Sequence, residues 1–192
     1  MRYGLATKAP LLRVRVLDPT LACGGFTDIA APVAEWQAVD LQVRRVFITE
    51  NEINGLCFPS AVDSAVVFGL GYGLDRLASL PWLVRAAVYY WGDIDTHGFA
   101  MLDRVHALLP HVRSLLMDRE TLFHHRAAWV TETSLHTTDL HRLDPTEAAL
   151  FDELRRHVHG DGIRLEQERV GFGWLQTALR KLDPPVSPHV VG

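Results

Sequence analysis

The chain has 192 residues, of which 48% are apolar and 22% charged, and this composition excludes a disordered protein because it suffices for one domain with a buried core. A net charge of −4 does not by itself favour a nucleic-acid-binding surface, although Lys8 and Lys181 are the only lysines among 19 basic residues. Two cysteines are too few for a zinc site, and no apolar run is long enough to cross a bilayer, so we expect a cytoplasmic protein without a disulfide or a membrane partner.

The first third of the chain predicts two strands with a helix between them. Residues 11–17 include alternating apolar and basic side chains, which is typical of an edge strand or a half-buried strand. Residues 28–39 carry apolar side chains at helical spacing and predict a helix. A strand follows from residue 43 and ends at Glu50. Because the chain starts directly on a strand, we expect either the carboxyl-terminal part of a larger protein or a naturally short one.

The middle third continues the alternation of strands and helices. Residues 65–70 predict a second apolar strand, followed by the glycine-rich turn 69–73 and a helix from about residue 74 that ends at Pro81. A third strand runs from residue 86 into Gly-Asp-Ile-Asp, and an amphipathic helix after Gly98 stops at Pro110. With a short strand at 112–117, this order predicts an α/β fold, a mainly parallel sheet with helices on both faces.

The last third predicts a small helical extension. Residues 119–142 are polar and show no clear periodicity. Asp144 and Glu147 have the spacing of a capping box that opens a helix, and a second helix is expected over 172–182. We therefore expect one domain over 1–183, with a lead-in strand and helix in 1–45, a core in 46–118, an extension in 119–183 and a loose tail in 184–192.

Three acidic side chains follow predicted strands at their carboxyl ends. Asp93 and Asp95 are two positions apart and can share a face, and Glu50 ends another strand. Open α/β sheets bind ligands at this edge, and close carboxylates favour a cation between them. Carboxylate oxygens select Mg²⁺ or Mn²⁺. The alternative for an isolated Asp-x-Asp is a turn rich in Asp and Gly.

Further polar residues near these acids are candidates for the same site. His97 follows the aspartates by two positions, where it could contact a scissile phosphate or a leaving oxygen. Glu168, like Glu166, is either an additional metal ligand or an ion-pair partner of Arg164 and Arg169. The other histidines lack the spacing that places two of them on one helical face, and solvent exposure explains them.

Three separated motifs carry a resemblance to a known family. The acid after one strand and the Asp-x-Asp after a later strand resemble the Toprim domain of topoisomerases, primases and related nucleases. The Asp-x-Asp-x-x-Gly pattern and the glycine-tyrosine turn are similar to those of the topoisomerase VI A subunit. Residues 47–54, 90–99 and 164–169 look like the carboxyl-terminal domain of JetD, the nuclease subunit of the Wadjet plasmid-defence system.

The resemblance implies an activity, a cofactor and partners. It implies a DNA endonuclease that uses Mg²⁺ or Mn²⁺, with Glu50, Asp93 and Asp95 as metal ligands. It also implies double-stranded DNA and the subunits of a condensin-like ATPase complex as partners of this chain. Either a monomer or a homodimer is compatible with it. JetD-like proteins also carry an amino-terminal region that engages DNA and partner subunits and is missing here, so the resemblance implies that activity requires that region or those partners.

Three alternative functions were weighed against the nuclease. A non-catalytic docking module would not require three convergent carboxylates. Cleavage through a covalent tyrosine, as in topoisomerases, would need a tyrosine from another domain, because Tyr89 and Tyr90 fall inside a buried strand. A phosphatase of the haloacid-dehalogenase type needs a lysine and an acidic pair downstream, and Lys181 is the only lysine after Asp95.

Overall fold

The computed structural model describes residues 9–182 and contains a six-stranded sheet in the order β2-β1-β4-β3-β5-β6. The strands β4, β3, β5 and β6 run parallel to one another, whereas β1 is antiparallel to both β4 and β2. The predicted α/β class with a mainly parallel sheet is confirmed, and the architecture is consistent with a Toprim-like fold. The sheet strands are β1 (Leu11–Val16), β2 (Asp28–Pro32), β3 (Arg45–Thr49), β4 (Ser64–Phe68), β5 (Ala87–Trp91) and β6 (Arg113–Ser114).

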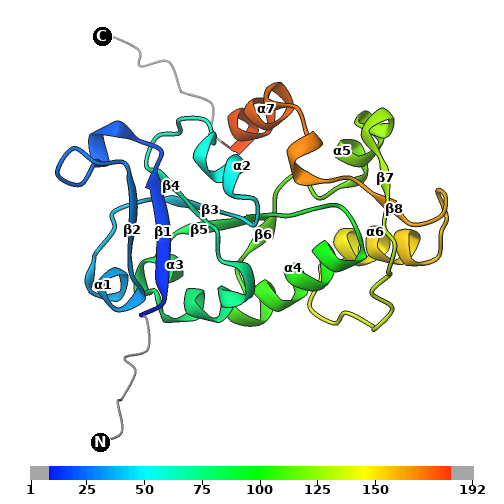
Figure 1. The fold of residues 1–192 in the computed structure, drawn as a ribbon, viewed down its shortest axis with the longest axis horizontal. Coiled ribbons are helices and arrows are strands. Elements are labelled where there is room, and N and C mark those ends of the chain that lie inside the picture. Colours follow the sequence, from blue (N-terminus) through cyan, green and yellow to red (C-terminus); the bar gives the residue numbers. More distant parts are fainter. Residues whose placement is uncertain (1–8, 183–192) are drawn as a thin grey trace, which may run out of the picture.

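Helices cover both faces of the sheet, as the alternation of elements predicts (Figure 1). The connection from β3 to β4 and the connection from β4 back past β3 to β5 run in opposite directions, so right-handed crossovers place their helices on opposite faces. Figure 1 shows α2 with α7 on one side and α3 with α4 on the other. The helices are α1 (Val33–Ala38), α2 (Glu52–Leu56), α3 (Pro81–Arg85), α4 (Thr96–Leu108), α5 (Arg119–His124), α6 (Pro145–Arg155) and α7 (Phe172–Leu182).

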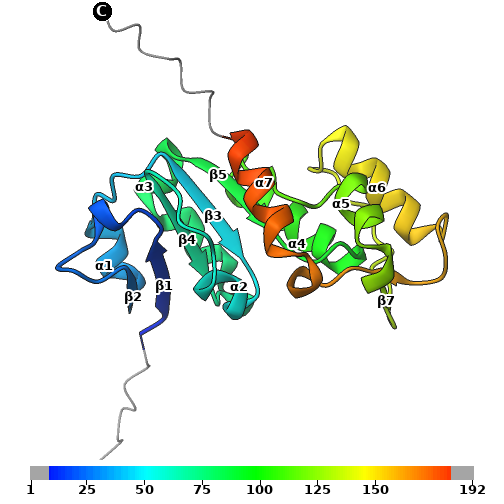
Figure 2. The ribbon, with the colours of Figure 1, turned by 90° about the horizontal axis from the view of Figure 1, so that it is seen from above.

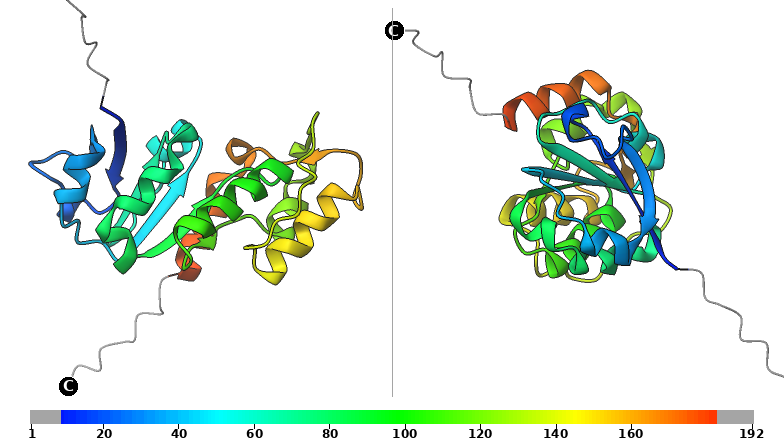
Figure 3. Two further views of the ribbon diagram at one scale, coloured as in Figure 1. Left: turned by 90° about the horizontal axis from the view of Figure 1, so that it is seen from below. Right: turned by 90° about the vertical axis from the view of Figure 1, so that its left-hand side faces the viewer.

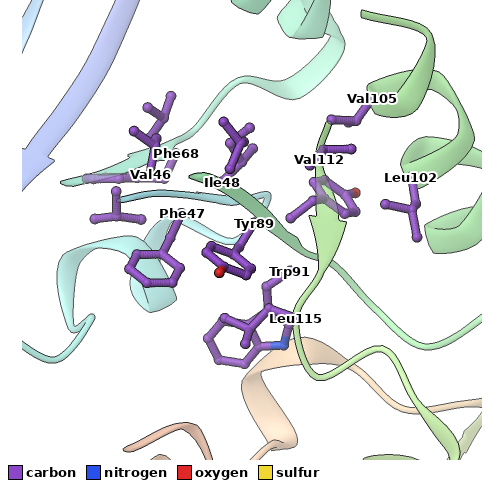
Figure 4. Close-up of a cluster of buried hydrophobic side chains, with 14 of the residues drawn as sticks. Val46, Phe47, Ile48, Phe68, Tyr89, Trp91, Leu102, Val105, Val112 and Leu115 are labelled. Atoms are coloured by element: carbon purple, nitrogen blue, oxygen red, sulfur yellow. The ribbon is translucent and has the colours of Figure 1, made fainter. Parts of the chain in front are cut away.

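The core is built on the central strands, whose alternate residues point to opposite faces (Figure 4). Phe47 stacks on Phe58 and on Tyr89, with ring centroids 4.8 and 5.6 Å apart. Ile48 points to the other face, toward the side where Leu102 of α4 packs. Every residue of β3 and β4 is buried, which explains why both strands read as continuous apolar runs in the sequence.

The prediction of a helix over 28–39 is wrong in its first half. Residues 28–32 form β2, which pairs with β1, and only Val33–Ala38 are helical. The reversal is made by Gly24 and Gly25, whose φ values of 58° and 87° suit glycine, between the bridged residues Cys23 and Phe26. Pairing with β1 outweighs the helical spacing of the apolar side chains.

Two other predicted boundaries differ from the structure. The helix expected from residue 74 is a 3₁₀ segment, η2 (Gly71–Ser79), and Pro81 begins α3 rather than only ending the helix before it. The strand expected over 112–117 is reduced to the two residues of β6. β6 is an edge strand of the sheet, and two residues are too few to show a local periodicity.

The carboxyl-terminal part lies at one end of the sheet, where α5, α6 and the small β7 gather (Figure 2). The view from below shows α6 beside α4, and these two helices are in contact (Figure 3). The polar stretch 119–142 contains more structure than its sequence indicates, because it includes α5, the 3₁₀ turn η3 (Arg126–Ala128) and β7 (Val130–Thr131). β7 pairs with β8 (Ile163–Arg164), which precedes the 3₁₀ turn η4 (Gln167–Arg169).

The predicted capping box and final helix are confirmed. The Asp144 carboxylate accepts hydrogen bonds from the backbone N–H groups of Thr146 and Glu147 at 2.7 and 2.8 Å, and the Glu147 carboxylate accepts from Asp144 N–H at 2.9 Å. The last helix spans the predicted residues 172–182. No helix within residues 9–182 is long and apolar enough to cross a membrane. The predicted tail 184–192 lies outside the described residues.

Candidate active site

Four predicted site residues line one cavity at the carboxyl edge of the sheet. Glu50 follows β3 and Asp93 and Asp95 follow β5, and these parallel strands are neighbours with Thr49 paired to Trp91. The three carboxylates, His97 and Arg164 line a cavity of about 220 Å³. Parallel pairing therefore brings together acids that are more than forty residues apart in the sequence.

Asp95 is held by the start of the helix that follows it. It is the N-cap of α4, and its Oδ1 accepts a hydrogen bond from Gly98 N–H at 2.6 Å. Its side chain is only 4% exposed. Burial, aided by the nearby charges of Glu132 and Asp93, raises the pKa of Asp95 to about 6, against the lowering effects of Gly98 and Arg164. Burial therefore outweighs the stabilisation of the Asp95 charge by Gly98 N–H and Arg164.

Asp93 is fixed by the segment that follows β8. Its Oδ1 accepts a hydrogen bond from Gln167 N–H at 2.8 Å, and its Oδ2 accepts one from an Arg164 Nη atom at 2.6 Å. Arg164 Nε lies 3.2 Å from Asp95 Oδ2, an ion-pair contact whose angles fall short of a hydrogen bond. One guanidinium thus joins both aspartates.

Glu50 is positioned by a tyrosine of the core. The buried Tyr90 hydroxyl donates a hydrogen bond to Glu50 Oε1. Burial raises the pKa of Glu50, and the charge of Asp93 adds to this, whereas Tyr90 and Arg164 lower it. Burial likewise raises the pKa of Tyr90 well above its ordinary value, so the phenol keeps its proton and remains a donor. The hydroxyl of a core tyrosine therefore orients a candidate catalytic carboxylate.

Two glycines are required for the carboxylates to converge. A Cβ atom at Gly98 would lie 2.1 Å from the Asp93 carbonyl oxygen, which is backbone and cannot move aside. A Cβ atom at Gly92 would lie 2.8 Å from the Tyr90 hydroxyl and 3.1 Å from Glu50 Oε1. Gly-Asp-Ile-Asp-Thr-His-Gly is thus a motif in which both glycines make room for the acids.

The segment 164–168 ties the two acid-bearing loops together. Leu165 and Ile94 exchange two backbone hydrogen bonds at 2.9 and 3.1 Å. The buried Gln167 side chain donates to Thr49 Oγ1, directly before Glu50. The segment 164–168 therefore binds the residues next to Glu50 and between Asp93 and Asp95, although it lies far from them in the sequence.

The two glutamates of this segment have different environments. Glu166 pairs with Arg169 at 2.7 Å and lies 3.8 Å from Arg164, as expected for an ion-pair partner. Glu168 does not line the cavity, and its Oε2 accepts a hydrogen bond from Asn51 Nδ2 at 3.2 Å. The structure thus does not bring Glu168 to the three convergent acids.

His97 lies against a buried acid that the sequence did not single out. Its Nε2 is 2.8 Å from the Ser134 carbonyl oxygen, which can only accept, so Nε2 carries the proton. Glu132 Oε1 is 3.9 Å from the same nitrogen and accepts from the Thr96 hydroxyl at 2.7 Å. Glu132 lies in the aperiodic polar stretch, so no sequence pattern could mark it.

The donor chemistry of the cavity fits a hard divalent cation, because carboxylate oxygens are the ligands that Mg²⁺ and Mn²⁺ prefer. The arrangement of the carboxylates in the structure fits a metal ion less well than their chemistry does. Among residues 9–182, no three or more His, Cys, Asp or Glu side chains form a group placed to hold a metal ion. The cation between Asp93 and Asp95 in the structure is the Arg164 guanidinium. Of the four metal ligands predicted from the sequence, Glu50, Asp93 and Asp95 line the cavity and Glu168 does not.

The chain matches the model of a known protein family. A family model described as "Wadjet protein JetD, C-terminal" matches residues 4–179. This match covers most of the chain, including all three motifs that carry the resemblance. A search of the curated proteins finds no match.

Proposed function

Because the chain belongs to the family of the carboxyl-terminal region of the Wadjet protein JetD, we propose that it is a divalent-metal-dependent DNA endonuclease domain of a Wadjet-type complex. The observation that carries the proposal is the convergence of Glu50, Asp93 and Asp95 on one cavity. The reaction is hydrolysis of a DNA phosphodiester bond. Double-stranded DNA and condensin-like ATPase subunits are the proposed partners, and a homodimer is the proposed form in which two strands are cut.

The metal sites of this proposal follow from the positions of the acids. Asp93 and Asp95 would hold Mg²⁺ or Mn²⁺, and Glu50 would hold a second ion or orient the attacking water. A bound divalent cation offsets phosphate charge and favours hydroxide over water as nucleophile. The remaining chemistry belongs to groups of the protein itself.

Protein groups around the acids would orient the substrate and the water. The Tyr90 hydroxyl fixes one oxygen of Glu50, which leaves the other as an acceptor for a water molecule. His97 lies at the same cavity, where its Nδ1 atom is the ring nitrogen left to contact a phosphate or leaving oxygen. Because backbone N–H groups hold Asp93 and Asp95, these two carboxylates need little reorientation on binding.

Nicking of supercoiled plasmid by the purified chain in Mn²⁺ tests the proposal. Asp93→Asn keeps the volume of the side chain and removes a charged ligand, so we expect a loss of nicking of about 100-fold or more. Asp161→Asn is the matched control, because Asp161 is fully exposed and lies outside the cavity. Equal nicking by Asp93→Asn and the unchanged protein would contradict the proposal.

If the unchanged protein does not nick DNA alone, calorimetry with Mn²⁺ replaces the cleavage assay. The proposal then requires Mn²⁺ binding that Asp93→Asn weakens and Asp161→Asn does not. Failure of the unchanged protein to bind Mn²⁺ would remove the nuclease proposal.

A non-catalytic docking module is a second candidate. The observation in its favour is Arg164, which already compensates Asp93 and Asp95 without a metal ion. This candidate predicts no rise in melting temperature with Mg²⁺ or Mn²⁺. Cleavage through Tyr89 or Tyr90 is not proposed, because both side chains are buried in the core.

A further inference from the structure

The two aspartates of the cavity are oriented in the same way. Oδ1 of each accepts a backbone hydrogen bond, from Gln167 N–H at 2.8 Å in Asp93 and from Gly98 N–H at 2.6 Å in Asp95. Oδ2 of each contacts Arg164, at 2.6 Å in Asp93 and 3.2 Å in Asp95. The backbone thus fixes one oxygen of each carboxylate, and the guanidinium takes the other.

The position of Arg164 is built into the fold. It ends β8, which is paired with β7, and the next residue, Leu165, forms a two-bond bridge to Ile94 between the aspartates. Its side chain is 36% exposed, yet its Nε atom is buried and forms no hydrogen bond within the described residues. Arg164 therefore holds Asp93 by a hydrogen bond from an Nη atom and contacts Asp95 only as an ion pair through Nε.

We propose that Arg164 is a resident counter-ion, a positioning residue that occupies the place of the divalent cation and leaves the two Oδ2 atoms when the cation binds. This inference rests on the proposed function, because it concerns the same site. The two oxygens that a shared cation would use are the two that Arg164 contacts. Removal of the guanidinium leaves both carboxylates oriented, since their Oδ1 atoms stay bound to backbone N–H groups.

Electrostatics makes the two cations compete. A divalent ion between the aspartates would lie within a few ångströms of the guanidinium, and like charges at such distances repel strongly in a partly buried site. A carboxylate for the displaced group is close by, because Glu166 Oε1 lies 3.8 Å from the same Arg164 nitrogen that contacts Asp93. Arg164 therefore compensates the charge of the two aspartates in the metal-free protein and weakens metal binding.

Calorimetric titration of the full chain with Mn²⁺ tests this inference. Arg164→Gln removes the charge but keeps a long side chain with a hydrogen-bond donor, and we expect it to bind Mn²⁺ about tenfold more tightly or better. Arg164→Lys keeps the charge, and its affinity should stay near that of the unchanged protein. Arg169→Gln makes the same change in net charge outside the cavity, and we expect an affinity change below about threefold.

The outcomes separate this inference from the proposed function. If the unchanged protein binds Mn²⁺ and Arg164→Gln binds it equally or more weakly, the counter-ion role is overturned and the nuclease proposal stands. If neither protein binds Mn²⁺, both are overturned. Tighter binding by Arg164→Gln and Arg169→Gln alike would show only a general effect of charge and would also overturn the counter-ion role.

A measurement on the unchanged protein covers the case in which Arg164→Gln does not fold. The Arg164 Nε–H signal, assigned in nuclear magnetic resonance spectra by its loss in Arg164→Lys, should shift on addition of Mg²⁺. An Nε–H signal that stays in place while Mg²⁺ binds would overturn the inference.

Discussion

At the scale of single residues, the site depends on glycines as well as on charged side chains. The carbonyl oxygen of Asp93 occupies the space into which a side chain at Gly98 would point. At the same time, Gly98 N–H holds Asp95. Gly98 therefore packs against the backbone of Asp93 and binds the side chain of Asp95.

Gly98→Ala tests this requirement. The added methyl group would lie 2.1 Å from backbone, so helix α4 must move away from Asp93, and we expect a loss of about 1–3 kcal/mol in the free energy of unfolding. Urea denaturation measures it. Gly173→Ala is the control, because no atom lies within 4 Å of that position in helix α7 and alanine favours helix. Equal stability of the two variants would contradict the steric argument.

The acids of the site were predictable from the sequence, whereas their partners were not. Glu50, Asp93 and Asp95 follow apolar strands, and a parallel sheet brings such positions to one edge. Arg164 appears in the sequence only as a flanking cation, because nothing local indicates that its segment returns to the Asp-x-Asp loop. Glu132 has no pattern at all, since its place beside His97 depends on the path of an aperiodic segment.

At the scale of elements, helices with strong local signals form where they were predicted. The capping box of α6 is complete in the structure, because the side chain of Asp144 accepts a hydrogen bond from Glu147 N–H and the side chain of Glu147 accepts one from Asp144 N–H. Residues 28–32 show the opposite case, in which pairing between strands overrides helical spacing. Local signals determine an element when its bonds are local, and tertiary pairing decides the rest.

Asp144→Ala tests the contribution of the cap. The backbone N–H groups of Thr146 and Glu147 would lose their acceptor, and we expect a loss of about 1 kcal/mol in the free energy of unfolding. Denaturation by urea is the measurement. Asp144→Ser retains a capping oxygen and should lose only a few tenths of a kcal/mol. A loss as large in the serine variant would indicate a role other than capping.

At the scale of the whole molecule, the carboxyl-terminal extension is tied together by charge. Glu153 of α6 accepts hydrogen bonds from Arg119 of α5, one of them at 2.8 Å, and its Oε2 lies 3.0 Å from His159 Nε2. The Arg119 hydrogen bonds, with the contribution of His159, lower the pKa of Glu153 to about 2 against the effect of burial. The ionised carboxylate thus helps to hold α5 against α6.

This pairing predicts a pH dependence of stability. A carboxyl whose pKa is lowered by folding stabilises the protein fully above its ordinary pKa of 4.5, and this stabilisation is lost as the pH falls toward about 2. The stability difference between the unchanged protein and Glu153→Gln should therefore be constant above about pH 5 and shrink below it. Thermal unfolding across pH 2–7 measures the difference.

A variant of a neighbouring glutamate distinguishes the Arg119–Glu153 pair from the general effect of protonating carboxylates at low pH. Glu120 is an exposed residue of α5, and Glu120→Gln should show no such narrowing of the stability difference. A difference between the unchanged protein and Glu153→Gln that persists at pH 2 would contradict the pairing.

The bridge between Ile94 and Leu165 joins residues that are far apart in the sequence, so it forms only after both have been synthesised. During translation, Asp93 is synthesised some seventy residues before Arg164. Until then the sheet can form, but Arg164, which lines the cavity at its carboxyl edge, is missing. The cavity is therefore completed after the sheet that carries its acids has been synthesised.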